Sequence, residues 1–349
     1  MKKRDIVDLI RAHYDHDDSQ FRLIAQRVAG EFEQQGDQQL ASYIMMQTSE
    51  VNSFVPQSVT YDTKFLTQIG TDDSPLPLPN VIANDLKGII NAVSHQQLGL
   101  GRFLFQGAPG TGKTASVKQL ARILDRTLLM VDFNQVIDSK LGQTAKNIAA
   151  VFKEINQMPN LSRVVILFDE IDALALDRLD VHDVREMGRA TSSILKELDN
   201  VNPEALIIAT TNLYDQLDVA FKRRFDKVVD FNRYQTEDLV AAGEVMLNAN
   251  LAAFKSAGHD IKLFRKILTV APKIPNPGEL RNSIKVAIGF SDPQKPYEYL
   301  TLLYKDLMGV SDLKQTDLRD QGFTIREIGI LTGKSKSTVA RELKGAEAE

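Results

Sequence analysis

The chain of 349 residues has no cysteine, which excludes disulfide bonds and thiolate metal sites. It also has no excess of basic residues: its net charge of −4 argues against a protein that coats nucleic acid or membrane indiscriminately. No apolar run approaches membrane-spanning length. The basic start Met1–Arg4 is typical of a signal peptide, but Asp5, Asp8 and Arg11 interrupt the apolar segment that should follow. We therefore expect a cytoplasmic protein without membrane contact.

A single glycine-rich loop is the most informative feature that the chain does have. It matches the phosphate-binding pattern G-x-x-x-x-G-K-[ST], between an apolar run at 102–105 and a helix start at 115–121. Its glycines let backbone N–H groups point at an anion, and the helix N-terminus adds positive charge. A turn that binds nothing is the alternative, which the order strand, loop, helix disfavours. The predicted nucleotide-binding residues are Gly107, Ala108, Pro109, Gly110, Thr111, Gly112, Lys113, Thr114 and Ala115.

An acidic pair follows the next strongly apolar run, at 164–168, which is typical of a strand buried on both faces. In such sites Lys113 reaches the β- and γ-phosphates, and the Thr114 hydroxyl binds Mg²⁺. At the carboxyl end of a parallel strand, Asp169 completes the Mg²⁺ site and Glu170 polarises the attacking water. The sequence thus predicts ATP and Mg²⁺ as cofactors.

Two further polar groups follow the apolar strand predicted at 206–209. Asn212 is placed to orient the water or to sense the γ-phosphate. Arg223 and Arg224 then interrupt an otherwise apolar segment, where two guanidinium groups are costly to bury without an anion. A solvated basic turn is the alternative for this pair.

In this order the segments resemble the AAA+ ATPases, specifically the AAA clade, over residues 76–290. The resemblance implies an α/β fold, a P-loop NTPase with a parallel sheet core and an all-α lid. It implies that Arg223 and Arg224 are arginine fingers that reach the nucleotide of the neighbouring subunit, a role worth about 10³–10⁵ in rate elsewhere. The implied working form is a homo-oligomeric ring, most often a hexamer.

Two stretches depart from the family pattern. The stretch matching the pore loop is Lys140-Leu141-Gly142, where lysine replaces the usual aromatic residue. Lysine contacts carboxylates or phosphates rather than apolar side chains, so threading of a polypeptide is in doubt; a solvated loop residue is the alternative. In the lid, Gly278 stands where many AAA+ proteins carry arginine. Arg281, nearly one turn further on, is either a substitute for it or a surface residue.

The last helices predicted in the chain resemble a helix-turn-helix. One helix begins near 323, a turn follows at 331–333, and a second helix covers 335–343. Its Lys334 stands where the motif usually has an apolar residue. Plain packing or protein docking is the alternative use of such a helix pair. The residues predicted to face DNA are Lys334, Lys336, Ser337, Thr338 and Arg341.

We expect five segments along the chain, with the N-terminal one either a self-contained helical bundle or a docking module. They are an N-terminal helical domain (1–50), a linker (51–75), the AAA+ core (76–235), a helical lid (236–300) and the C-terminal helix-turn-helix-like segment with its tail (301–349).

The predicted function is Mg²⁺-dependent ATP hydrolysis by a ring that remodels or regulates a protein partner bound through residues 1–50. Stand-alone bacterial AAA ATPases, some partnered with subtilisin-like proteases, are similar. The alternative is a DNA-associated ATPase or loader tethered by its C-terminal helices. A nucleotide-gated switch that hydrolyses slowly is disfavoured, because Glu170, Asn212, Arg223 and Arg224 are all present.

Overall fold

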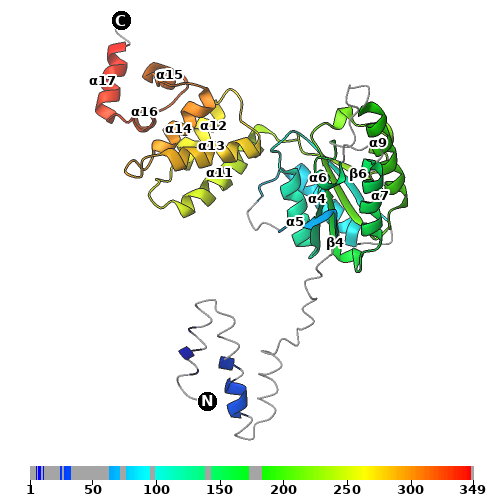
Figure 1. Cartoon of the computed structure of the whole chain (residues 1–349). Helices are drawn as coiled ribbons and strands as arrows, with labels where there is room; N and C mark the ends of the chain where they lie inside the picture. Colours follow the sequence, from blue (N-terminus) through cyan, green and yellow to red (C-terminus); the bar gives the residue numbers. More distant parts are fainter. Residues whose placement is uncertain are drawn as a thin grey trace. The chain divides into compact units, whose positions relative to one another are not determined.

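The structure, a computed structural model, divides the chain into two compact units, Met1–Asp62 and Thr63–Glu349 (Figure 1). The described residues of the first unit are helical, and Ile24, Val28 and Ala29 are buried there. Most of the predicted N-terminal domain lies outside the described residues. Those described are 5, 7–8, 11, 24–25, 27–32, 63–70, 76–94, 99–137, 143–172 and 183–346.

The second unit is built on a six-stranded sheet in the order β1-β3-β4-β5-β2-β6. β1 pairs antiparallel with β3, and every other neighbouring pair is parallel. This confirms the predicted α/β class with a parallel P-loop core. The strands are β1 (Leu66–Gln68), β2 (Arg102–Gln106), β3 (Thr127–Val131), β4 (Val164–Phe168), β5 (Leu206–Thr211) and β6 (Lys227–Asp230).

β1 lies within the range predicted to be linker. Its three residues have no strong apolar alternation, so only the pairing of Leu66 with Val131 in β3 shows that they are strand. The Thr63 hydroxyl donates to the Leu66 carbonyl at 2.8 Å just before the strand. The chain therefore joins the sheet about ten residues before the predicted start of the core.

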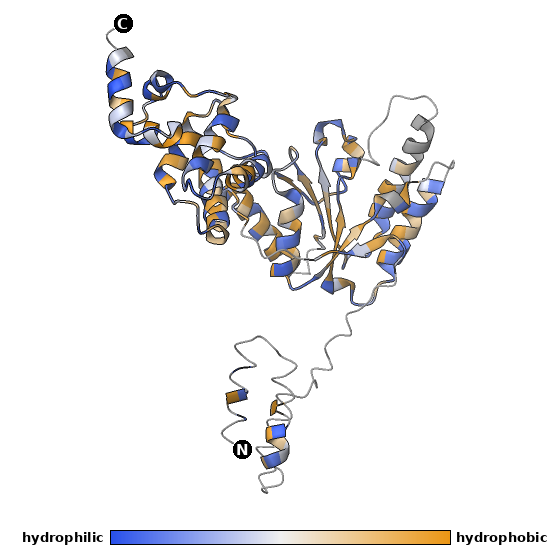
Figure 2. Cartoon of the chain, turned by 60° about the vertical axis from the view of Figure 1, so that its left-hand side comes forward, coloured by the Kyte–Doolittle hydropathy of each residue, from blue (hydrophilic) through white to orange (hydrophobic). Residues whose placement is uncertain are grey.

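Helices cover both faces of the sheet, so the central strands β4 and β5, largely apolar in Figure 2, are buried at every residue. On one face, α4 and α5 share a buried cluster with β2 and β5. On the other, Ile148 of α7 and Ile194 of α9 pack near Phe168 of β4. The helices are α4 (Asn80–Ser94), α5 (Lys113–Ile123), α6 (Phe133–Val136), α7 (Gln143–Asn156), α9 (Asp183–Asn200) and α10 (Val219–Lys222).

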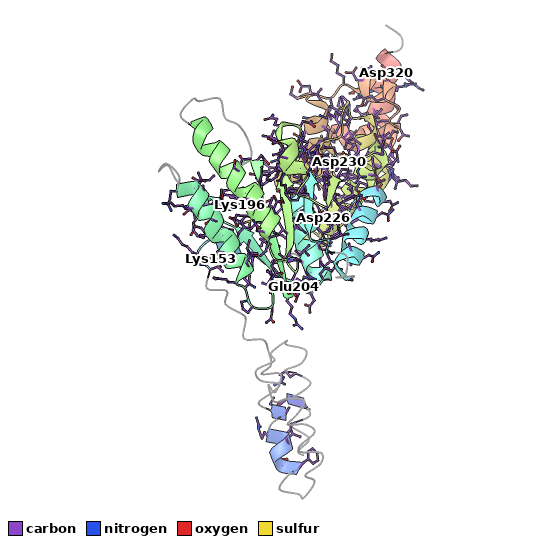
Figure 3. All side chains as sticks on the ribbon, turned by 90° about the vertical axis from the view of Figure 1, so that its right-hand side faces the viewer. Lys153, Lys196, Glu204, Asp226, Asp230 and Asp320 are labelled. Atoms are coloured by element: carbon purple, nitrogen blue, oxygen red, sulfur yellow. The ribbon has the colours of Figure 1, made fainter. Side chains whose placement is uncertain are left out.

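The parallel strands all end on one edge, which gathers the loops that carry chemistry. Figure 3 shows the two edges: Glu204, just before β5, lies far from Asp230, the last residue of β6. The loops after β2, β4 and β5 therefore leave the sheet together on the Asp230 side.

Seven helices that follow β6 share one apolar core, which runs from Ala242 in α11 to Leu343 in α17. The predicted boundary at residue 300 falls inside α14, whose Leu300 and Leu303 are fully buried in that core. The helices on both sides of the boundary thus pack as one body, and the predicted domain limits remain predictions. The helices are α11 (Thr236–Ala253), α12 (Ile261–Val270), α13 (Pro277–Phe290), α14 (Glu298–Met308), α15 (Gln315–Asp320), α16 (Ile325–Thr332) and α17 (Lys336–Ala346).

Local sequence explains where the later helices begin and end. Asn276 with Glu279 and Thr324 with Glu327 form capping boxes at the starts of α13 and α16. Gly333, in the left-handed region, ends α16. Across the described part of the chain, no helix has the length and apolar content needed to cross a membrane.

Candidate active site

The loop between β2 and α5 has the backbone that a phosphate cradle needs. Gly110 and Gly112 have φ of 78° and 96°, which side chains disfavour. α5 begins at Lys113, so its unpaired N–H groups face the loop. The predicted residues 107–115 therefore form one turn that is open to an anion.

The Lys113 ammonium is held inside this turn. Its Nζ donates to the carbonyls of Gly107 at 2.7 Å and Ala108 at 2.9 Å, and to Asn212 Oδ1 at 2.7 Å. Burial lowers the pKa of Lys113 from its ordinary value, against the opposing attraction of nearby carboxylates. An anion beside the loop would therefore meet a cation that is already largely desolvated.

Thr114 and Asp169 meet although they are 55 residues apart. The Thr114 hydroxyl donates to Asp169 Oδ1 at 2.8 Å, and the Thr210 hydroxyl donates to the same oxygen at 2.6 Å. Hydroxyl and carboxylate oxygens are the hard ligands that Mg²⁺ prefers. The two predicted metal ligands thus lie together, and their chemistry fits this ion.

Glu170 is positioned by its backbone and by Asn212. Its φ of 53° is rare for a residue with a side chain, and its N–H donates to the Thr210 hydroxyl at 2.9 Å. Asn212 Nδ2 donates to Glu170 Oε1 at 3.3 Å while its Oδ1 accepts from Lys113. Asn212 therefore links the phosphate-binding lysine to the residue predicted to polarise water.

Four residues that support this arrangement escaped the sequence analysis. Thr210 braces Asp169 and Glu170, and buried Asp172 accepts from the Asn212 N–H at 3.3 Å. Asn232 accepts from the Ala108 N–H at 2.8 Å. Tyr234 donates to the Thr111 carbonyl at 3.1 Å. Thr210 directly follows the apolar strand predicted at 206–209, but nothing in the sequence marked the other three.

The protonation state of Tyr234 suits this bond. Burial, with a contribution from Asp238, raises the pKa of Tyr234 to about 12, so its hydroxyl stays a donor at neutral pH. Tyr234 immediately precedes the lid helices, and Thr111 belongs to the phosphate loop. The bond therefore anchors the entry of the lid to the loop.

The lid closes one side of a cleft of about 260 Å³ over the phosphate loop. The N–H of Gly278 in α13 donates to the Gly110 carbonyl at 2.8 Å. A Cβ on Gly278 would lie 2.8 Å from the Gly110 Cα, so no side chain fits at this position. Arg281 lines the cleft one turn later, together with Lys113.

The two predicted arginine fingers differ in their surroundings. Arg224 donates to the Ala220 carbonyl at 2.6 Å and pairs with Asp199 at 3.1 Å. Arg223 is exposed and has no ion-pair partner among the residues that the structure describes. Neither arginine lines the cleft of its own chain.

The remaining predicted site residues lie elsewhere or outside the description. The pore-loop residues Lys140, Leu141 and Gly142 lie outside the described residues. In the C-terminal helix pair, Lys336, Ser337 and Arg341 are exposed and Thr338 is half-buried. Lys334, which was also predicted to face DNA, pairs through its ammonium with Glu342 at 2.7 Å.

Comparisons with known proteins find AAA family ATPases. The family model for the ATPase family associated with various cellular activities (AAA) matches residues 103–233. The uncharacterized AAA family ATPase y4kL of Sinorhizobium fredii is 30% identical over 253 residues, which cover 67% of this chain and 75% of the relative. CD-NTase-associated protein 6 of Pseudomonas aeruginosa is 32% identical over 145 residues, which cover 37% of this chain and 47% of that protein.

Solved structures match as well. One of them is a HORMA:CdnC:Trip13 complex of E. coli MS115-1, in which the matching chain is 19% identical with a TM-score of 0.49. The match covers 64% of this chain and 83% of the other.

Proposed function

Because the chain belongs to the AAA family of ATPases and is an ATP hydrolase, we propose that it is an Mg²⁺-dependent ring ATPase that remodels or regulates a protein partner. The observation that carries the chemical part is the chain of contacts from Lys113 through Asn212 to Glu170. These three groups come from the loops after three parallel strands, and all line one cleft.

In this proposal ATP phosphates draw the Lys113 ammonium away from the loop carbonyls that it now contacts. Asn212 then loses its hydrogen bond from Lys113 and keeps its hydrogen bond to Glu170. The Asn212 side chain therefore responds to the γ-phosphate and orients the Glu170 carboxylate. Glu170 orients and polarises the attacking water, and accepts its proton through that contact. Thr114 and Asp169 would hold Mg²⁺, which would supply positive charge to the phosphates of ATP.

The arginines support an active site shared between subunits. Arg223 is exposed and absent from the cleft of its own chain, which fits a finger that serves a neighbouring nucleotide. Arg224 is tied to Asp199 and to the Ala220 carbonyl, so we assign it to holding α10 and aiming Arg223. Val219, on the same short helix, is 60% exposed, which is favourable if α10 packs against another copy.

The protein-partner part rests on the first unit, Met1–Asp62, which is compact and separate from the ATPase unit. One relative, CD-NTase-associated protein 6, is named for association with another protein. We propose by analogy that this chain, too, works on a protein, which docks on residues 1–50.

The experiment uses the Glu170→Gln variant, which should bind ATP without turning it over, as a trap in cells. A partner retained by the full-length trap is purified and added back to the wild-type enzyme. We expect it to change the ATPase rate of the full chain by severalfold and to leave a chain lacking residues 1–62 unaffected. Equal responses of both chains would contradict docking on the first unit, and undiminished turnover by Glu170→Gln would contradict the catalytic assignment.

A further inference from the structure

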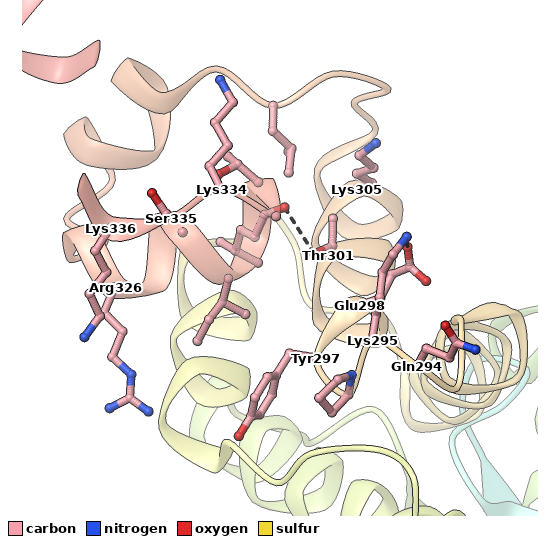
Figure 4. Close-up of a pocket in the computed structure, with 17 residues that line it drawn as sticks. Gln294, Lys295, Tyr297, Glu298, Thr301, Lys305, Arg326, Lys334, Ser335 and Lys336 are labelled. Carbon is pink, nitrogen blue, oxygen red and sulfur yellow. Dashed lines mark hydrogen bonds and ion pairs between the residues drawn. The ribbon is translucent and has the colours of Figure 1, made fainter. Parts of the chain in front are cut away.

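A large hollow on the described surface lies outside the ATP site. It has a volume of about 1020 Å³ and is formed by α14, α16 and the turn into α17 (Figure 4). Its lining holds one carboxylate, that of Glu298, against five basic side chains. These five are Lys295, Lys305, Arg326, Lys334 and Lys336.

Two of the five charges are already neutralised. Lys295 contacts Glu298 at 3.2 Å and Asp292 at 3.8 Å. Lys334 contacts Glu342, and this hydrogen bond holds the pKa of Glu342 below its ordinary value. Both amines are therefore engaged within the chain.

The other three cations are free to meet an anion. Lys305, Arg326 and Lys336 have no ion-pair partner anywhere in the described ranges. Figure 4 shows the Arg326 and Lys336 side chains pointing to the same side of the hollow. Unpaired cations that share one concave surface attract an extended polyanion.

The adjoining helix α17 presents a polar face next to these cations. Ser337 and Arg341 are exposed one turn apart, whereas Val339 and Leu343 are buried against the lid core. The Ser335 hydroxyl accepts from the Thr338 N–H at 3.2 Å and caps the helix start. A helix of this kind fits the major groove of duplex DNA, which is about 12 Å wide.

We propose that this surface binds duplex DNA without the help of Lys334. Arg326, Lys336 and Lys305 contact the phosphate backbone, and α17 faces the major groove with Ser337 and Arg341. An acidic peptide is the competing occupant of a cationic hollow. The exposed polar face of α17 favours the duplex, because a short hydroxyl and an arginine are the side chains that read base edges and phosphates.

Hydrogen bonds and a shared apolar core connect this surface to the lid. The Thr301 hydroxyl of α14 donates to the Leu331 carbonyl of α16 at 3.1 Å. Lys266 of α12 donates to the Gly322 carbonyl at 2.7 Å and to Glu327 at 2.8 Å. The same apolar core includes α13, whose Gly278 contacts the phosphate loop. DNA that restrains α17 therefore restrains the lid, and we expect it to change ATP turnover.

The direct test is fluorescence anisotropy of a labelled duplex of about three helical turns, titrated with the full chain at several salt concentrations. The double variant Arg326→Gln, Lys336→Gln should bind at least about tenfold more weakly and reduce the salt slope by about 2. Two single controls should leave affinity within about twofold: Lys334→Gln, whose charge is already paired, and Lys285→Gln on the exposed face of α13.

Each other outcome overturns the proposal. If the double variant binds the duplex as tightly as wild type, this surface is not the binding site. If Lys285→Gln loses as much affinity as the double variant, the effect comes from net charge alone. Binding of polyglutamate at these residues without binding of the duplex assigns the hollow to an acidic peptide. Anisotropy needs no ATP turnover, so this result is independent of the proposed partner remodelling. A duplex effect on the ATPase rate of wild type, absent from the double variant, tests the coupling.

Discussion

The N–H of Gly278 donates a hydrogen bond to the carbonyl of Gly110 at 2.8 Å, across 168 residues of chain. The contact brings the first turn of α13 onto the phosphate loop with no side chain between them. Where many AAA+ proteins carry an arginine, this chain thus has a direct backbone contact. The lid thus contacts the phosphate loop directly, and Arg281 of the lid lines the cleft.

We predict that Gly278→Ala weakens ATP binding by about fivefold or more, because the new Cβ would lie 2.8–2.9 Å from Gly110 atoms and push α13 away. Binding of a fluorescent ATP analogue measures the effect. Gly289→Ala is the matched control: it makes the same change in the same helix, where nothing lies within 4 Å of the added Cβ. Equal affinities for the two variants would show that the contact has no role in binding.

Asn212→Ala should lower kcat by about 10²–10³ while ATP affinity changes by only a few fold. The Asn212 side chain connects Lys113 with Glu170. Its loss leaves the Glu170 carboxylate without this hydrogen bond but keeps the phosphate loop intact. Steady-state kinetics separate the two parameters. If affinity falls as much as kcat, Asn212 acts in binding rather than in positioning Glu170.

We predict that two threonines bonded to Asp169 affect the Mg²⁺ dependence of the ATPase to different extents. Thr114→Val removes a proposed Mg²⁺ ligand and should raise the Mg²⁺ concentration for half-maximal ATPase by at least about tenfold. Thr210→Val removes only the bond that braces Asp169, and should raise it by less. Thr211→Val is the control, because that hydroxyl accepts from Leu213 N–H and is not bonded to Asp169. An unchanged Mg²⁺ dependence in Thr114→Val would exclude this threonine as a ligand.

The contact between Lys266 of α12 and Glu327 of α16 makes the stability of the helical region dependent on pH. Burial raises its pKa, but hydrogen bonds from Lys266 and Thr324 outweigh burial and hold the pKa below 4.5. The stabilisation is therefore complete above pH 4.5 and is lost as pH falls through the lowered value. We expect Glu327→Gln to cost about 1 kcal/mol of unfolding free energy at neutral pH.

Urea unfolding of wild type and Glu327→Gln from pH 7 down to pH 3 measures this difference, because the loss is expected only below pH 4.5. It should shrink toward the acid end as the wild-type carboxylate becomes protonated. A difference that stays constant over this range would mean that the variant disturbs packing rather than charge.

The sequence was sufficient to predict the core of the fold, because the patterns that indicate its strands and its phosphate loop are local. The apolar run 164–168 became the fully buried β4, and the loop 107–112 lies between strand and helix as its glycines require. The meeting of Thr114 with Asp169 also followed from the parallel-sheet rule.

The other contacts depend on distant pairing that no local pattern reveals. β1 forms a strand only through its pairing with β3. Asn232 and Tyr234 form hydrogen bonds with the phosphate loop from more than 120 residues away. The pairing of Lys334 with Glu342 was not predicted, because the helix-turn-helix pattern places Lys334 in the turn and does not indicate an ion-pair partner for it. The joining of α15–α17 to the lid likewise depends on a core assembled from seven helices.

The proposed shared active site is tested most directly by mixing two inactive variants, Glu170→Gln and Arg223→Ala. Each variant alone should retain no more than about 1% of wild-type ATPase. In randomly mixed rings, about a quarter of the interfaces join an intact Glu170 to a neighbour's intact Arg223. We therefore predict that an equal mixture recovers activity well above either variant, as it would only if the arginine acts across subunits. A mixture as inactive as its components would contradict a site completed by the neighbouring subunit.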